Sequence, residues 1–161
     1  MIGLSAPDGL IMDLFGPFAG RHHDMRMVRE SHINSRIRDL QLGNENQYCM
    51  YADKGYADMS HLVAAYHGAN LTQPQIRING VLTLVRVSVE WCFGKISESQ
   101  MYINFPRCQQ LQLQPVGKYY RLAVLLMNAN TCLYGSQTSI HFNLKAPSLG
   151  EYFDCADEIQ V

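Results

Sequence analysis

Apolar segments flanking a turn at the start of the chain predict a β-hairpin. Met1–Ala6 and Leu10–Phe15 have the length and composition of strands, and Pro7-Asp8-Gly9 between them has the composition of a tight turn. A loop rich in glycine and proline follows over residues 16–21, and Asp24 stands where it could cap a helix. Apolar residues then recur at helical spacing at Met25, Val28, Ile33, Ile37 and Leu40. The pattern therefore predicts a hairpin followed by a helix.

A further strand-like segment ends at an acidic residue. Residues 48–52 form a short apolar run with the length of a buried strand, and Asp53 follows directly. Because functional groups gather at the carboxyl ends of strands in open α/β sheets, Asp53 is well placed for chemistry. The alternative interpretation is that Asp53 begins a turn with Gly55. Residues 58–66 are then predicted as a short helix and residues 71–79 as a loop.

The stretch from Arg86 to Gly94 fits two patterns. A strand-like alternation with polar residues involves Val85, Val87, Val89 and Trp91. A helical stripe is also present and involves Val81, Leu82, Val85, Val89 and Phe93. Periodicity alone leaves strand and helix open. Glu90 stands among apolar neighbours here, and a buried carboxylate needs a counter-charge, either Arg86 at the i, i+4 spacing or a bound cation.

The clearest predicted helix lies in the last third of the chain. Pro115 stands where a helix begins and Gly135 where it ends. The apolar stripe between them comprises Leu122, Leu125, Leu126, Ala129 and Leu133. Residues 102–105 are expected to be extended and residues 138–144 to form a short strand. Residues 146–161 are predicted to be a loose acidic tail, which leaves one domain over residues 1–145.

Composition and charge indicate a folded domain with no large excess of positive or negative charge. Hydrophobic residues make up 47% of the chain and charged residues 17%, with a formal net charge of −1. Four acidic residues lie in the final segment, so 10 of the 14 acidic residues stand against all 13 basic ones in residues 1–150. That mildly positive balance does not by itself indicate nucleic-acid binding.

Cysteine usage and hydropathy exclude several other classes of protein. The five cysteines are odd in number and contain no Cys-x-x-Cys pair, which favours free thiols in a reducing compartment. The first residues lack the pattern of a secretory signal, and the longest apolar run, residues 122–127, is far below the roughly 20 residues of a membrane span. We therefore expect a nuclear or cytoplasmic protein.

Three blocks in this order carry a family resemblance. The first two are Gly20-x-x-His23-Asp24 and Ala52-Asp53-x-Gly55-Tyr56. The third is Asn79 followed by Arg86-x-x-Val89-Glu90-x-x-Phe93-Gly94. Together with the hairpin they resemble the PIF/Harbinger-type branch of the DDE transposase superfamily, over about residues 1–135. The resemblance implies an α/β fold of the RNase H-like type, with a mixed five-stranded sheet flanked by helices.

The resemblance also implies chemistry at named positions. Asp53 matches the second catalytic Asp of the family, and Glu90 matches the catalytic Glu, which the family places on a helix. Such carboxylates hold two divalent metal ions, Mg²⁺ or Mn²⁺, that activate the attacking oxygen and stabilise the leaving oxygen in phosphodiester cleavage of DNA. Arg86 and His23 are expected to support the metal ligands or to contact a phosphate.

One part of the family pattern is not met. The first catalytic Asp of the family lies on a central strand before the hairpin, and the sequence from Met1 onward does not supply it. We therefore expect an N-terminally truncated domain whose first central strand is missing. Asp24 could replace the absent ligand, although a helix cap is the alternative reading. The chain is then expected to be either a catalytically incomplete DNA endonuclease or a non-catalytic module that binds a protein or DNA partner.

Overall fold

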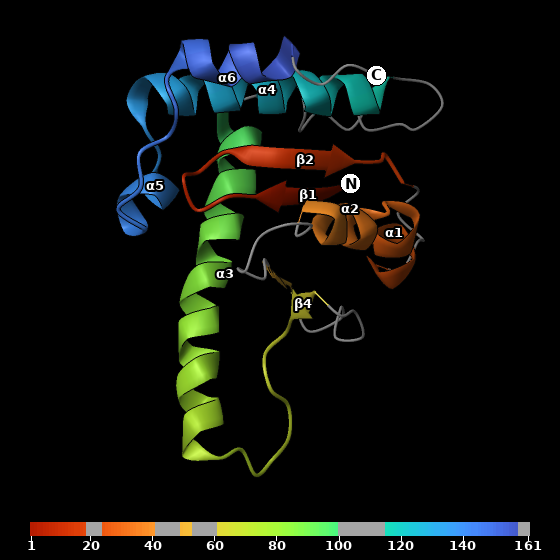
Figure 1. The fold of residues 1–161 in the computed structure, drawn as a ribbon, viewed down its shortest axis with the longest axis vertical. Coiled ribbons are helices and arrows are strands. Elements are labelled where there is room, and N and C mark those ends of the chain that lie inside the picture. Colours follow the sequence, from red (N-terminus) through yellow and green to blue (C-terminus); the bar gives the residue numbers. More distant parts are fainter. Residues whose placement is uncertain (19–23, 41–48, 53–60, 100–114, 158–161) are drawn as a thin grey trace. The chain divides into compact units, whose positions relative to one another are not determined.

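A computed structural model describes residues 1–18, 24–40, 49–52, 61–99 and 115–157 (Figure 1). Within these residues the fold is mixed α/β and mostly helical. Two compact units divide the chain, one made of Gly3–Pro17 and Ser88–Val161 with Met1, the other of Phe18–Val87 with Ile2. The boundary falls inside the longest helix, so each unit is considered by itself below.

The predicted hairpin is confirmed. Strands β1 (Ile2–Ser5) and β2 (Ile11–Phe15) form a two-stranded sheet and run in opposite directions (Figure 1). The Ala6 N–H donates to the carbonyl of Leu10 at 2.8 Å, and the Gly9 N–H donates to the carbonyl of Ala6 at 3.0 Å. Gly9 has a φ of 90°, a conformation that favours glycine and explains the residue at the end of the turn.

The ambiguous central stretch is helical. Helix α3 runs without a break from Gln73 to Ser99 and includes all of residues 86–94. It also begins inside residues 71–79, which were predicted to be a loop. The signal for this start is a capping interaction, because the Thr72 N–H donates to Oε1 of Gln75, three residues later, at 2.8 Å. Tertiary packing and capping thus outweigh the β-branched content that favoured a strand.

Helix α4 (Val116–Tyr134) ends at Gly135 as predicted, but its buried face is not the predicted one. The buried residues are Val116, Ala123, Val124, Met127, Asn128 and Thr131. Leu122, Leu125, Leu126 and Leu133 of the predicted apolar stripe are exposed instead. Because α4 is apolar around most of its circumference, periodicity identifies the helix without identifying the side that is buried.

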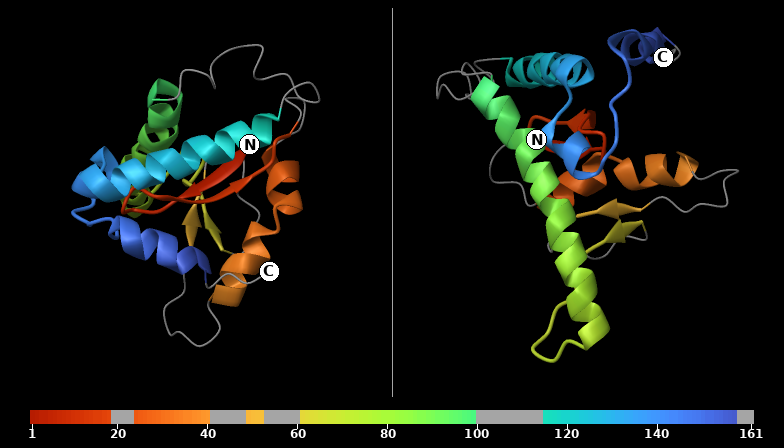
Figure 2. Two further views of the ribbon diagram at one scale, coloured as in Figure 1. Left: turned by 90° about the horizontal axis from the view of Figure 1, so that it is seen from above. Right: turned by 90° about the vertical axis from the view of Figure 1, so that its left-hand side faces the viewer.

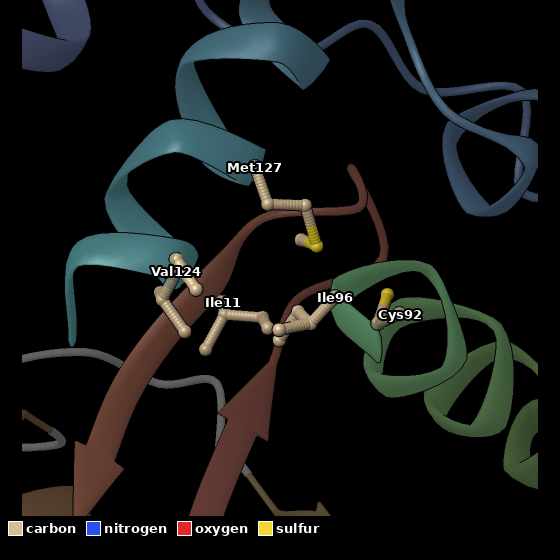
Figure 3. Close-up of a cluster of buried hydrophobic side chains, with 6 residues drawn as sticks. Ile11, Cys92, Ile96, Val124 and Met127 are labelled. Atoms are coloured by element: carbon tan, nitrogen blue, oxygen red, sulfur yellow. The ribbon is translucent and has the colours of Figure 1, made fainter. Parts of the chain in front are cut away.

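The core of this unit joins three elements. Side chains from β2, α3 and α4 gather in one cluster (Figure 3). Leu14, Phe93 and Tyr120 pack against it. Its buried members are Ile11, Cys92, Ile96, Ala123, Val124 and Met127. Gly3 lies so close to the ring of Phe93 that a Cβ at this position would collide with it. The cluster fixes the hairpin against the C-terminal part of α3.

Two further helices replace the strand and the tail predicted at the C-terminal end. Helix α5 (Gln137–His141) stands where a strand over residues 138–144 was predicted. The Ser136 side chain accepts from the Ser139 N–H at 3.0 Å, and the Ser139 side chain accepts from the Ser136 N–H at 2.9 Å, a reciprocal cap that favours helix. Helix α6 (Leu149–Asp157) forms where a loose tail was predicted, and it contacts α4. Figure 2 shows the two helices from two further sides. The division of the chain at residue 145 stays a prediction.

The second unit contains two short helices and a small parallel sheet. Helices α1 (Asp24–Glu30) and α2 (Ile33–Leu40) replace the single helix predicted here. The break lies at His32, which has a φ of 52°, and the Ser31 hydroxyl donates to the carbonyl of Val28 at 2.7 Å. The predicted pattern already contained this irregularity, because Val28 and Ile33 are five residues apart.

Strands β3 (Met50–Tyr51) and β4 (Leu62–Val63) pair in parallel in this unit. The strand predicted before Asp53 is therefore confirmed at Met50 and Tyr51, whereas the helix predicted over residues 58–66 is wrong at Leu62 and Val63. The residues described by the structure hold two separate two-stranded sheets. A five-stranded RNase H-like sheet and its missing central strand stay predictions.

Candidate functional site

Glu90 lies on α3 with its side chain exposed. The prediction that it is buried among apolar neighbours is therefore wrong. A helix turns about 100° per residue, so Glu90 points roughly 160° away from Ser88 and Cys92, which face the core. The cost of burying a carboxylate consequently sets no requirement for a counter-charge at this position.

Arg86 is exposed on the same helix, one turn before Glu90. Residues four apart on a helix lie on neighbouring positions of one face, which is the geometry that the predicted ion pair needs. The ion pair itself stays a prediction. An exposed pair of this kind typically contributes no more than about 0.5 kcal/mol to helix stability. Its main effect would be to orient the Glu90 carboxylate.

Glu90 lines a cavity of about 370 Å³ inside the unit formed by the hairpin and the C-terminal half of the chain. Residues from α3 form one wall, and residues from the hairpin turn, α4 and the start of α5 form the rest. The lining residues are Gly9, Glu90, Trp91, Cys92, Gly94, Lys95, Glu98, Met127, Thr131, Ser136, Gln137 and Thr138. The volume lies within the range of small-molecule sites in proteins.

The charged groups of the cavity come from one helix. Glu90 and Glu98 supply carboxylate oxygens, which suit hard divalent cations, and Lys95 supplies an ammonium group, which suits a phosphate. Sequence reasoning missed Glu98 and Lys95. Their spacing from Glu90 gives no signal, because five and eight residues along a helix correspond to offsets of about 140° and 80°.

The uncharged polar groups of the cavity are mostly satisfied. Cys92 belongs to the core, and its Sγ lies 3.3 Å from Oγ1 of Thr138. Burial raises the pKa of the Cys92 thiol, the hydrogen bond with Thr138 opposes this rise, and the negative charge of Asp8 adds to it. Oγ1 of Thr131 is buried and makes no hydrogen bond to the described residues. The Trp91 ring packs edge-on against His141, with the ring centroids 5.5 Å apart.

The other candidate residues are not brought together with Glu90 by the described structure. Asp53 and His23 lie outside the described residues, directly after β3 and directly before α1. Asp24 begins α1, and its side chain is also outside the description. Among the side chains that the structure describes, no group of three His, Cys, Asp or Glu residues is arranged to hold a metal ion. These side chains alone therefore do not complete a two-metal site.

The helices that the structure describes include none that is long and apolar enough to cross a membrane. This agrees with the short apolar runs of the sequence.

Comparison with known proteins identifies one family. The model of the DDE superfamily endonuclease family matches residues 1–128. No curated protein and no solved structure matches the chain. The matched region contains the hairpin, Asp53, the whole of α3 with Glu90, and α4 as far as Asn128. Because the match covers most of the 161 residues, the chain belongs to the DDE superfamily of endonucleases.

Proposed function

We propose that this chain is a transposase-derived nuclease domain of the PIF/Harbinger type, whose reaction class is metal-dependent cleavage of DNA phosphodiesters. The observation that carries the proposal is the placement of Glu90. The family resemblance requires a helix at Glu90, where the local pattern left strand and helix open, and α3 is helical throughout this region. The family match includes the same helix.

Asp53 and Glu90 are the proposed metal ligands. Divalent Mg²⁺ and Mn²⁺ prefer carboxylate oxygens, and Glu90 presents its carboxylate at the surface of α3. When bound, two such ions activate the attacking oxygen and stabilise the leaving oxygen. Arg86, one turn from Glu90, is proposed to orient the carboxylate or to contact a phosphate. His23 has the same proposed role, and Asp24 is the candidate for a third ligand.

We propose further that residues 1–161 by themselves do not cleave DNA. The family chemistry uses three carboxylates, and the motifs assign two of them within this sequence. An RNase H-like sheet also requires a central strand beside the hairpin and β3, which the motifs do not assign either. The domain is then complete only with a strand and a carboxylate supplied from elsewhere.

Titration with Mn²⁺ tests the ligand assignment. Glu90 and Glu98 both lie on α3 and line the same cavity, but only Glu90 matches the family motif. We expect weak Mn²⁺ binding by the wild-type chain in calorimetry, with dissociation constants on the order of 10⁻³ M because the ligand set is incomplete. Glu90→Gln should weaken this binding further, and Glu98→Gln should leave it unchanged. Equal effects of the two substitutions would contradict the assignment of Glu90.

A plasmid-nicking assay with Mg²⁺ or Mn²⁺ tests the predicted lack of cleavage. The wild-type chain should leave supercoiled DNA intact. If the wild type nicks the plasmid and Glu90→Gln does not, the chain has a complete site and the proposed incompleteness is wrong. Nicking by both proteins to the same extent would indicate a contaminating nuclease or a site that does not use Glu90.

A second candidate function is a non-catalytic module that binds a protein or DNA partner. It is favoured by the two-of-three carboxylate count and by the exposed apolar face of α4. Mn²⁺ binding separates the two candidates, because a module that has lost its site should bind no metal and should be insensitive to Glu90→Gln.

A further inference from the structure

Helix α4 presents an apolar surface to solvent on the side opposite the core. Leu122, Leu125, Leu126 and Leu133 are 41–57% exposed, and together we call them the α4 leucine stripe. With Ala129, the residues at positions 122, 126, 129 and 133 are separated by four, three and four residues. This spacing places them in one line along a helix, and it is the spacing of the contact positions in a coiled coil.

Helix α4 has a buried face as well as this exposed apolar one. The opposite side of α4 packs in the core through Ala123, Val124 and Met127, so the helix is already held in place. Three half-exposed leucines in one line, Leu122, Leu126 and Leu133, form an apolar patch with Leu125 beside them, and monomeric proteins rarely expose large contiguous apolar patches without a binding role. The patch therefore indicates a partner.

The charges beside the stripe favour a second copy of this chain as that partner. Lys118 and Arg121 are exposed in the first part of α4, which carries no acidic residue. Helix α6 carries the exposed Glu151 and Asp154 and no basic residue among its described side chains.

Helix α6 and Arg121 lie on the same flank of α4. Tyr152 of α6 accepts a hydrogen bond from Nδ2 of Asn128 at 3.0 Å, and Arg121 precedes Asn128 by seven residues. Seven residues are close to two helical turns, so Arg121 and Asn128 lie on nearly the same side of the helix. An antiparallel two-fold pair of α4 helices brings equal flanks of the two copies together in reversed direction. Arg121 of one copy then faces the side of the other copy on which α6 lies. The dipoles of the two antiparallel helices also point in opposite directions, which is favourable.

We propose that the α4 leucine stripe is a homodimer interface in which two copies of α4 pack antiparallel about a two-fold axis. The contact positions span about three helical turns, which is a small interface. We therefore expect a dissociation constant of roughly 1–100 μM. The interface does not include Glu90 or the cavity, so the proposal is independent of the proposed nuclease function.

Analytical ultracentrifugation of the full 161-residue chain, from about 1 to about 200 μM, tests the proposal over the expected range of affinity. The average mass should rise from that of the 18.3 kDa monomer toward twice this value. Leu126→Glu places a charge at the centre of the stripe and should raise the dissociation constant at least about tenfold. Met12→Glu is the matched control, because Met12 is 62% exposed on β2, outside the stripe, and it should dimerise like the wild type.

A charge exchange tests the antiparallel arrangement. Arg121→Glu and Asp154→Lys should each weaken the dimer severalfold, and the double variant should recover most of the lost affinity. A wild-type chain that stays monomeric throughout the concentration range would overturn the proposal. So would a dimer that Leu126→Glu and Met12→Glu weaken equally. Dimerisation without recovery in the double variant would overturn the antiparallel pairing. Circular dichroism of each variant shows whether the fold is retained.

Discussion

Asn128 takes the place of a neighbouring strand at the edge of the hairpin. Its side chain is 1% exposed, and its Oδ1 accepts from the Ile11 N–H at 2.9 Å. Its Nδ2 donates to the Ile11 carbonyl at 2.9 Å and to the Tyr152 hydroxyl at 3.0 Å. The side-chain amide of Asn128 thus pairs both the N–H and the carbonyl of Ile11, and it links β2, α4 and α6.

Asn128→Leu keeps the number and branching of the side-chain heavy atoms and removes all three hydrogen bonds. The N–H and the carbonyl of Ile11, a residue that is 4% exposed, are then buried without these partners. Each buried unpaired group costs about 1–3 kcal/mol, so the substitution should lower the free energy of unfolding by roughly 2–5 kcal/mol. For a chain of this length the melting temperature should fall by about 5–15 °C.

Tyr152→Phe is the matched control, because it removes only the bond between Nδ2 and the Tyr152 hydroxyl. It should cost about 1 kcal/mol. Urea denaturation measures both values, and hydrogen exchange followed by NMR should show that the Ile11 amide loses protection in Asn128→Leu but keeps it in Tyr152→Phe. Equal stabilities of the two variants, or an Ile11 amide that stays protected in Asn128→Leu, would refute this account of Asn128.

Two further predictions concern the hairpin turn and the buried thiol. Gly9→Ala adds a Cβ at a positive φ and against the Ser136 hydroxyl, so urea denaturation should show a loss of more than about 1 kcal/mol, and larger than that of Gly68→Ala, where φ is also positive but no atom lies within 4 Å. Burial raises the pKa of the Cys92 thiol in the folded protein above its ordinary value of 9.0. The stability that the protonated thiol contributes is present below this ordinary value and is lost as the pH rises through the higher pKa of the folded state, because the unfolded chain loses its thiol proton at a lower pH. The fall in unfolding free energy between pH 8 and pH 10, values chosen to bracket the ordinary thiol pKa of about 8.5–9, should be smaller in Cys92→Ala. An equal fall in both proteins would contradict the assignment to Cys92.

The hairpin and α4 were predictable because their signals are local. A turn ending in Gly9 and a helix between Pro115 and Gly135 depend on backbone conformations that these residue types favour. The buried side of α4 was not predictable, since leucines occupy the exposed side and Asn128 and Thr131 the buried one. Which side is buried depends on tertiary contacts with α6 and with the hairpin, and the Ile11–Asn128 contact to the hairpin spans 117 residues of sequence.

The sequence predicted which residue belongs to the candidate site better than it predicted the surroundings of that residue. The family resemblance assigned Glu90 to a helix, and α3 is helical there. Its exposure was not predictable from its apolar neighbours, because in a helix the adjacent residues in sequence point in other directions. Glu98 and Lys95 lie outside the family motif, so only the fold shows that they line the same cavity as Glu90.

The partners of the hairpin are synthesised long after the hairpin itself. Ile11 is paired by Asn128, 117 residues later, and Gly9 lies against Ser136. A growing chain therefore carries the hairpin without these contacts until α4 and α5 have left the ribosome. A polypeptide that stopped at residue 128, where the family match ends, would lack Ser136, Thr138 and Tyr152. The segment beyond the family match is thus needed to complete the N-terminal packing, and expression trials that trim the chain to the matched region should produce an unstable protein.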